Sequence, residues 1–215
     1  MRIRLIYEKY DTLRYSSTLD LQKIWERSLR RAKINITYTQ GFHPHPKMQI
    51  ALPLPLGFIS QVEVIDIWID DDLNSNQIKK QLYNKLPYGL KIKSILEIES
   101  TSNSFVNQIK SVSYKVKINS KNLNFEEFQN RINQFIEKKT IHRTRMKKSY
   151  DLRPLVNSLL LVSDKNSSIY LLMNLSAKAG KTGRPDEIVD ELGLDIVDCV
   201  IIRTSIETYE NIGGK

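Results

Sequence analysis

Apolar and polar positions alternate through the opening segment "MRIRLIYEKY", which predicts a β-strand with its apolar residues on one face and Arg2 and Arg4 on the other. The spacing of apolar residues then changes to three and four positions, which predicts a helix capped by Ser17 or Thr18. The apolar stripe of this helix comprises Leu21, Ile24, Trp25, Leu29 and Ala32.

The rest of the first half completes the order β-α-β-β-α-β. Extended segments are expected at residues 48–58 and 60–70, a second helix at 74–87 and a closing strand at 90–100. The polar stretch at 100–108 follows, and it is typical of a boundary between two halves of a chain.

The second half repeats this order without obvious residue identity. Its expected elements are a strand at 109–118, a helix at 124–139, a hairpin formed by 149–165 and 167–178, a helix at 184–194 and a strand at 195–209. We therefore predict an α+β protein of two tandem ferredoxin-like (β-α-β-β-α-β) units, at residues 1–100 and 108–215.

Charge adds an expectation about partners. The 215 residues include 33 lysines and arginines against 24 aspartates and glutamates, which gives a formal net charge of +9. A basic domain favours a polyanionic partner, and we expect RNA. The alternative is a solvated basic surface that has no specific partner. The longest apolar runs, such as "LLLV" at 159–162, are too short to span a bilayer, so we expect a cytoplasmic protein with no membrane partner.

Cys199 is the single cysteine of the chain. One cysteine excludes an internal disulfide and any cysteine-based metal or iron–sulfur cluster on this chain. Its apolar neighbours in "IVDCVIIRT" predict a buried, inert thiol within a strand.

Three basic clusters are the candidate sites for a polyanion. The first, on the predicted helix, comprises Lys23, Arg27, Arg30 and Arg31. The second, in "EKKTIHRTRMKKSYDLRP", comprises Lys138, Lys139, Arg143, Arg145, Lys147 and Lys148. If this segment is extended, Arg143, Arg145 and Lys147 share one face. The third, in "SAKAGKTGRPDE", comprises Lys178, Lys181 and Arg184.

Each cluster also has a plainer interpretation. A solvated helix face would explain the first cluster, and a flexible solvated loop would explain the second. The third precedes a predicted helix N-terminus and contains glycines, both of which favour phosphate binding. Asp186 and Glu187 can satisfy that helix start instead. The segment "AGKTGR" lacks the first glycine of a Walker A loop, so no such loop is predicted.

The stretch "TYTQGFHPHPKMQIALPLPLG" at 37–57 contains His43 and His45. A metal site there needs a third ligand, and none is near in the sequence. A general base acting on a ribose 2′-hydroxyl needs a second acid or base, which is not evident either. We therefore expect a proline-shaped connection that lies beside a cleft formed by the basic clusters and contributes to ligand binding. The residues expected to do so are Phe42, His43, His45 and Lys47.

The segment "STLDLQKIWERSLRRAKINITYTQGFHPHPKMQIALPLPLGFIS" at 17–60 resembles the radical-SAM-linked domain, a family of unknown function. Its members stand alone or are fused to the C-terminus of radical SAM proteins with cobalamin-type domains. The later segments "RTRMKKSYDLRPLV" and "GRPDEIVDELGL" resemble that family's later motifs, so the resemblance covers nearly the whole chain. It implies a companion role beside a radical SAM protein. This chain has no CxxxCxxC motif and is not itself a radical SAM enzyme.

The charge, the three basic clusters and the ferredoxin-like pattern predict a non-catalytic RNA-binding module. The resemblance alone implies that it serves a radical SAM enzyme or another RNA- or ribosome-directed enzyme. No catalytic residue, metal or cofactor is expected, and no oligomeric state is predicted. Two alternatives stay open. One is a protein–protein adaptor whose basic face docks an acidic partner, and the other is a metal-independent endoribonuclease that uses His43 or His45.

Overall fold

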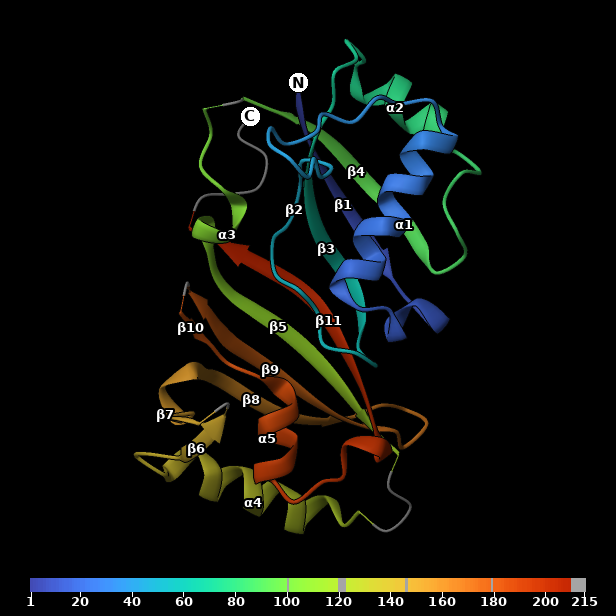
Figure 1. Cartoon of the computed structure of the whole chain (residues 1–215). Coiled ribbons are helices and arrows are strands. Elements are labelled where there is room, and N and C mark those ends of the chain that lie inside the picture. The colour runs from blue at the N-terminus through green and yellow to red at the C-terminus, as the bar shows by residue number, and fades with distance from the viewer. Residues whose placement is uncertain (100, 120–122, 146, 179, 210–215) are drawn as a thin grey trace. The chain divides into compact units, whose positions relative to one another are not determined.

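The computed structural model describes residues 1–99, 101–119, 123–145, 147–178 and 180–209. The chain divides into two compact units, unit 1 at residues 1–105 and unit 2 at residues 106–215. Both combine helices with antiparallel strands, so the protein belongs to the α+β class (Figure 1). No helix within the described residues is long and apolar enough to cross a membrane.

Unit 1 contains an antiparallel sheet with the strand order β4-β1-β3-β2. Its elements are β1 (Arg2–Lys9), the 3-10 helix η1 (Asp11–Tyr15), α1 (Thr18–Arg31), β2 (Met48–Ile50), β3 (Ile59–Trp68), α2 (Ser75–Leu82) and β4 (Leu90–Ile98). The short helix α3 (Phe105–Gln108) begins at the last residue of this unit.

Helix α1 begins after Ser17, one of the two caps that the sequence predicts. The Ser17 hydroxyl accepts a hydrogen bond from the Asp20 backbone N–H at 3.1 Å, and the Asp20 carboxylate accepts one from the Ser17 N–H at 3.3 Å. The ring of Trp25 meets the ring of Tyr7 edge-on, with the centroids 4.9 Å apart. The core of unit 1 joins α1, α2 and the sheet through Ile3, Leu5, Leu21, Leu29, Ile65, Ile67, Ile78 and Leu82.

The face of β1 opposite its apolar residues is buried as well, which alternation alone does not predict. Asp66 of β3 lies between Arg2 and Arg4 and accepts hydrogen bonds from Arg2 at 2.6 Å and from Arg4 at 2.7 and 3.0 Å. Each guanidinium also lies over an aromatic ring. Arg2 is 5.1 Å from the centroid of Trp68, and Arg4 is 4.4 Å from the centroid of Phe105.

Unit 2 contains an antiparallel sheet with the strand order β8-β9-β5-β11, and β10 pairs with the end of β9. The strands β6 and β7 form a separate hairpin. The elements are β5 (Ile109–Ile118), α4 (Phe125–Glu137), β6 (His142–Arg145), β7 (Lys148–Asp151), the 3-10 helix η2 (Arg153–Leu155), β8 (Val156–Ser163), β9 (Ile169–Lys178), β10 (Lys181–Thr182), α5 (Pro185–Glu191), the 3-10 helix η3 (Ile196–Asp198) and β11 (Cys199–Thr208).

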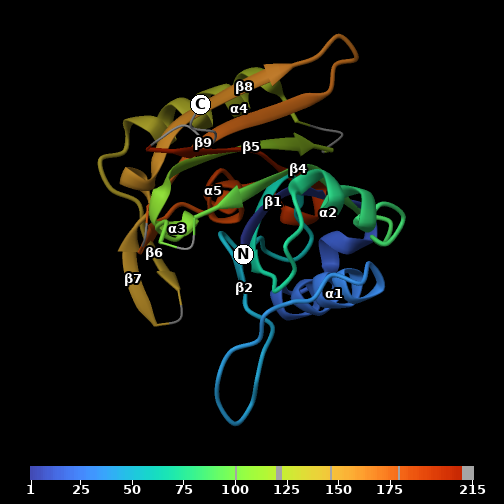
Figure 2. The ribbon, with the colours of Figure 1, turned by 90° about the horizontal axis from the view of Figure 1, so that it is seen from above.

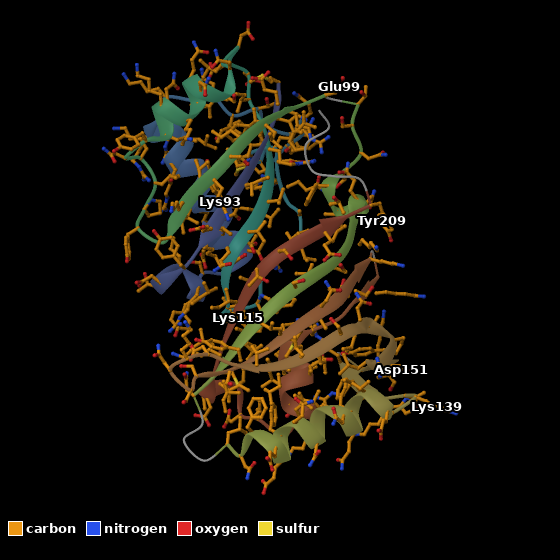
Figure 3. The ribbon with its side chains drawn as sticks, turned by 180° about the vertical axis from the view of Figure 1, so that it is seen from behind. Lys93, Glu99, Lys115, Lys139, Asp151 and Tyr209 are labelled. Carbon is orange, nitrogen blue, oxygen red and sulfur yellow. The ribbon has the colours of Figure 1, made fainter. Side chains whose placement is uncertain are left out.

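The core of unit 2 uses alternate positions of its strands. The buried side chains include Val112, Tyr114 and Val116 of β5, Leu171, Met173 and Leu175 of β9, and Phe128, Ile132 and Phe135 of α4. Lys115 alternates with the buried residues of β5 and is marked on that strand in Figure 3. Its ammonium lies 3.9 Å from the centre of the Tyr170 ring.

Among the predicted segments that differ from the structure, three have a local cause. The strand expected at 48–58 is limited to Met48–Ile50, because prolines at 53 and 55 cannot donate ladder hydrogen bonds. The strand expected at 149–165 is divided by η2, which contains Pro154. Strand β6 ends at Arg145, and Lys147 has a left-handed backbone with φ 64°, so Lys147 does not continue a face with Arg143 and Arg145. Residue 100, at the predicted boundary, lies outside the described residues, as do residues 146 and 179 of the basic segments.

Candidate anion-binding pocket

A pocket of about 730 Å³ lies within unit 2, between the β6–β7 hairpin, η2 and the segment that joins β9 to β10. We name it the basic pocket, because five of its lining residues are the cations Arg145, Lys148, Lys178, Lys181 and Arg184. Tyr150, Pro154 and Leu155 form its apolar lining. Parts of the second and third predicted clusters, far apart in the sequence, are therefore brought together.

The β6–β7 hairpin presents one wall of this pocket. Arg145 pairs directly with Lys148 across the hairpin, so both side chains point to the same face. Tyr150 follows Lys148 by two positions and shares that face. The hairpin thus places an aromatic ring beside two positive charges.

The second wall is built by β9, β10 and the turn between them. Lys178 pairs with Lys181, and Gly180 in the turn has φ +75°, which suits glycine. Gly183 follows β10 and lies against η2. A Cβ at that position would be 2.9 Å from the Leu155 carbonyl oxygen and 3.1 Å from the Leu175 Cβ. A side chain at 183 would therefore disturb the apolar lining.

Four of the cations are available to a ligand. Arg145, Lys148, Lys178 and Lys181 are exposed, and none of them makes an ion pair with a residue that the structure describes. The acid of the lining, Asp151, is already used by the backbone. Its carboxylate accepts hydrogen bonds from the N–H groups of residues 141 and 153 at 2.8 and 3.0 Å.

Arg184 is not available in the same way. Its Nε donates to Asp186 at 3.0 Å, and Glu187 lies 3.8 Å away. Both acids belong to the first turn of α5, where they also suit the helix dipole. The two acids therefore neutralise Arg184, and the N-cap side chain makes no hydrogen bond to the start of α5.

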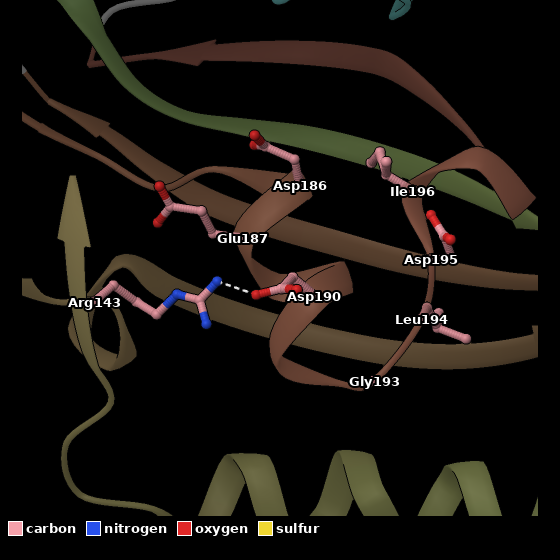
Figure 4. A pocket seen from close by; sticks show the side chains of 8 residues that line it. All are labelled: Arg143, Asp186, Glu187, Asp190, Gly193, Leu194, Asp195 and Ile196. Atoms are coloured by element: carbon pink, nitrogen blue, oxygen red, sulfur yellow. Dashed lines mark hydrogen bonds and ion pairs between the residues drawn. The ribbon is translucent and has the colours of Figure 1, made fainter. Parts of the chain in front are cut away.

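Arg143, which the sequence places with the cations of the second cluster, is committed to α5. It makes ion pairs with Asp190 and Glu191. The hydrogen bond to Asp190 is the main cause that raises the pKa of Arg143. Figure 4 shows this contact at a separate pocket of about 680 Å³ that is lined by Arg143, by four acids and by three apolar or glycine residues. Arg143 therefore anchors the hairpin to α5 and is not one of the basic pocket's lining residues.

The first predicted cluster lies in unit 1, on α1. Lys23, Arg27 and Arg30 are exposed. Arg31 donates to the Ser28 hydroxyl at 3.1 Å and to the backbone carbonyl of residue 85 at 2.7 Å, so it is partly used within the fold.

Arg30 also lines a pocket of about 530 Å³ together with Tyr38 and Glu26. The Tyr38 hydroxyl donates to the Glu26 carboxylate at 3.2 Å. Partial burial and the Glu26 charge raise the pKa of Tyr38. This pocket lies at the base of the histidine-containing stretch.

Residues 38–46 form a hairpin that projects from the body of unit 1 (Figure 2), and we name it the projecting hairpin. Its stem is hydrogen-bonded, with Thr39 N–H donating to the His45 carbonyl at 2.8 Å and His45 N–H donating to the Thr39 hydroxyl at 3.0 Å. Phe42 at its tip is fully exposed, and His43 is exposed beside it. The exposed Lys47 lies just beyond the stem, with its ammonium 4.8 Å from the centre of the Trp68 ring.

The described residues contain no group of three or more His, Cys, Asp or Glu side chains that could hold a metal ion.

Sequence reasoning missed the apolar part of the basic pocket. Tyr150 carried a signal, because its two-residue spacing from Lys148 in an extended segment places both on one face. Leu155 carried none, since its position depends on the turn at Pro154 and on the approach of Gly183.

The fold and the pocket define an α+β protein with a basic pocket that has an apolar lining. The chain belongs to a family described as an uncharacterized protein conserved in bacteria, DUF2344, which matches residues 2–185. No curated protein matches the chain.

One similar solved structure is a chain from the crystal structure of a Cbf5-Nop10-Gar1 complex, with a TM-score of 0.50 and 8% sequence identity. The alignment covers 94% of this chain and 48% of that chain, so this protein spans about half the length of its structural relative. A crystal structure of a putative glycine cleavage system transcriptional repressor aligns over 98% of both chains with 10% identity and a TM-score of 0.24. The first similarity concerns the fold alone, and the second is too low to indicate a shared fold.

Proposed function

We propose that this protein is a non-catalytic RNA-binding module. The observation that carries the proposal is the set of four cations around the basic pocket, which make no ion pair with a described residue. Like charges gathered at one site repel one another, and phosphate groups relieve that repulsion. An apolar lining beside the charges suits a ligand that has both phosphates and bases.

We also propose that each unit is ferredoxin-like. In both units the first strand lies between the third and the fourth, and the second strand is at the edge, as β4-β1-β3-β2 and β11-β5-β9-β8. Both units run β-α-β-β-α-β along the chain, and the β6–β7 hairpin is inserted after α4 in unit 2. On this proposal the insertion supplies one wall of the basic pocket.

A companion role to a radical SAM enzyme is part of the proposal. It is supported by the resemblance of residues 17–60 and of the two later segments to the radical-SAM-linked domain. The single cysteine means that the cluster-binding motif of such an enzyme must be on another chain or segment. Co-purification of the tagged protein from its own cells, with and without RNase, tests this role. Recovery of no protein with a CxxxCxxC motif would oppose it.

RNA binding is tested by filter-binding titration with total RNA at two salt concentrations. We expect the affinity to fall as salt rises, by about 0.7 logarithmic units per decade of salt for each cation that contacts a single strand. A dissociation constant weaker than about 10⁻⁴ M at low salt, or a slope near zero, would refute the proposal.

A matched pair of variants locates the site. Lys178→Gln combined with Lys181→Gln should lower the slope by about 1.4, because two phosphate contacts are lost. The control combines Lys79→Gln with Lys80→Gln, which removes the same charge from exposed positions of α2. Equal losses in the two double variants would show that net charge, and not the basic pocket, governs binding.

The projecting hairpin is proposed to contribute contacts and no bond cleavage. His43→Ala combined with His45→Ala should weaken RNA binding by about 1–3 kcal/mol, the range for a lost stacking contact. The wild-type protein should leave RNA uncut. Fragments with 2′,3′-cyclic phosphate ends, absent with the double variant, would instead establish the endoribonuclease alternative.

The adaptor alternative has less support from unit 1. An exposed Trp68 would favour it, but Trp68 is half-buried between the side chains of Arg2 and Lys47. Affinity capture from lysate discriminates the two functions. Protein partners that survive nuclease treatment would favour an adaptor, and partners lost with the RNA would favour the RNA-binding module.

A further inference from the structure

The basic pocket is concave and contains an aromatic side chain. Both features favour an unstacked base over a base in an RNA duplex. Its volume of about 730 Å³ lies in the range of about 300–1,000 Å³ that is usual for pockets that enclose a small molecule. The bases of an A-form duplex are stacked and paired, and side chains cannot read its deep, narrow major groove. A base enters a pocket of this kind only when it is unstacked.

Tyr150 is placed to receive such a base. It is partly exposed in the pocket, and the structure shows no hydrogen bond from its hydroxyl to another described residue. Pro154 and Leu155 continue the apolar lining beside it. Stacking of a base on an aromatic ring is tolerant of sequence, because every base has a π-face.

The cations stand on two separate walls. Arg145 and Lys148 come from the β6–β7 hairpin, and Lys178 and Lys181 come from the β9–β10 segment. A strand of RNA has a phosphate on each side of every nucleotide, so one nucleotide held in the pocket offers a phosphate to each wall. A free mononucleotide has phosphate on one side only and leaves one wall without a partner.

We propose that the basic pocket binds one unstacked nucleotide of single-stranded RNA, with its base on Tyr150 and its two flanking phosphates on the two cationic walls. This inference rests on the proposed RNA-binding function and specifies the form of RNA that the pocket takes. The pocket recognises a nucleobase together with phosphate. Its two cationic walls favour a strand of RNA over a free mononucleotide as the ligand.

The test measures fluorescence anisotropy with a labelled seven-nucleotide single strand, a labelled blunt-ended RNA duplex without loops, and unlabelled UMP and AMP as competitors. The single strand should bind at least about 10-fold tighter than the duplex. Tyr150→Leu keeps an apolar side chain without the ring and should weaken single-strand binding about 5- to 150-fold. Tyr150→Phe keeps the ring and should retain binding. Tyr83→Leu is the matched control, since Tyr83 is exposed in unit 1, and it should change nothing.

Each result has a definite meaning. Equal binding of the two RNAs, together with an unchanged affinity of the Tyr150→Leu variant, would overturn the inference. The proposed function would still stand if the salt-dependent binding persisted. If UMP or AMP bound as tightly as the single strand, the proposal that the ligand is a strand and not a free nucleotide would be overturned. An unchanged salt slope in Tyr150→Leu, with its affinity lowered, supports stacking as the role of the ring, because no phosphate contact has then been lost.

Discussion

Replacing Asp66 by Asn should strongly destabilise unit 1. The substitution keeps the shape of the side chain and removes the charge that lies between two buried guanidiniums. Asp66 is 2% exposed and accepts three hydrogen bonds, at 2.6, 2.7 and 3.0 Å, from Arg2 and Arg4. Breaking a buried ion pair by removing one partner costs about 3–5 kcal/mol, because the remaining charge is left uncompensated.

The structure places the expected cost near the lower end of that range. Both guanidiniums retain other partners, since Arg2 also donates to the Ser102 carbonyl at 2.7 Å and each guanidinium lies over an aromatic ring. We therefore expect a loss of about 3 kcal/mol. With a urea dependence of about 1–3 kcal/mol/M, the midpoint of unfolding falls by about 1–3 M.

Tryptophan fluorescence during urea unfolding measures this directly, because the two tryptophans of the chain, Trp25 and Trp68, both belong to unit 1. The control is Glu8→Gln. Glu8 is 3.7 Å from Lys93, whose side chain is 47% exposed, and such a pair contributes less than about 1 kcal/mol. An Asp66→Asn protein no less stable than Glu8→Gln would refute the reasoning about the buried charges.

Three further substitutions or treatments have defined outcomes. Burial raises the pKa of the Cys199 thiol to about 11, so at pH 8 only about 0.1% is thiolate, and reaction with a disulfide reagent should stay slow until urea unfolds the protein. Gly183→Ala should cost about 1–3 kcal/mol, measured by thermal unfolding followed by circular dichroism, because its Cβ would be 2.9 Å from the Leu155 carbonyl oxygen. Ser17→Ala should cost about 1 kcal/mol by loss of the α1 cap. Hydrogen bonds from Ser17 lower the pKa of Asp20, so the part of the stabilisation that depends on the Asp20 carboxylate is present above its ordinary pKa and is lost as the pH falls through the folded-state value. The deficit of the Ser17→Ala protein should therefore shrink in acid without vanishing, because the bond from the Asp20 N–H to the Ser17 hydroxyl does not titrate.

Local patterns predicted the parts of the fold that depend on local interactions. The Ser17 cap and the apolar spacing of α1 lie within one segment, so the sequence alone was sufficient for that helix. The burial of Arg2 could not be predicted in the same way. It depends on Asp66, which is far along the chain and meets Arg2 only when β1 and β3 pair in the observed register.

The same distinction applies to the candidate site. Clustering along the sequence predicted where the cations are concentrated, but it could not show which of them are neutralised by acidic partners. Arg143 and Arg145 have the same local surroundings in the sequence, yet Arg143 meets Asp190 of α5 and Arg145 faces the basic pocket. The partner of each cation is set by tertiary packing, and only the structure separates a cation that anchors the fold from one that makes no ion pair with a described residue.

The stem of the projecting hairpin makes its tip a natural attachment point for a chemical reporter. Two hydrogen bonds between Thr39 and His45, one of which the Thr39 hydroxyl accepts, hold the stem without help from the Phe42 side chain. Because Cys199 is partly buried and its pKa is raised to about 11, we expect it to react slowly, so Phe42→Cys introduces a single fast-reacting thiol without removal of the native one. A dye attached there extends into solvent from the surface proposed to meet RNA, and it can follow encounter with that RNA in real time while the body of unit 1 is left unmodified.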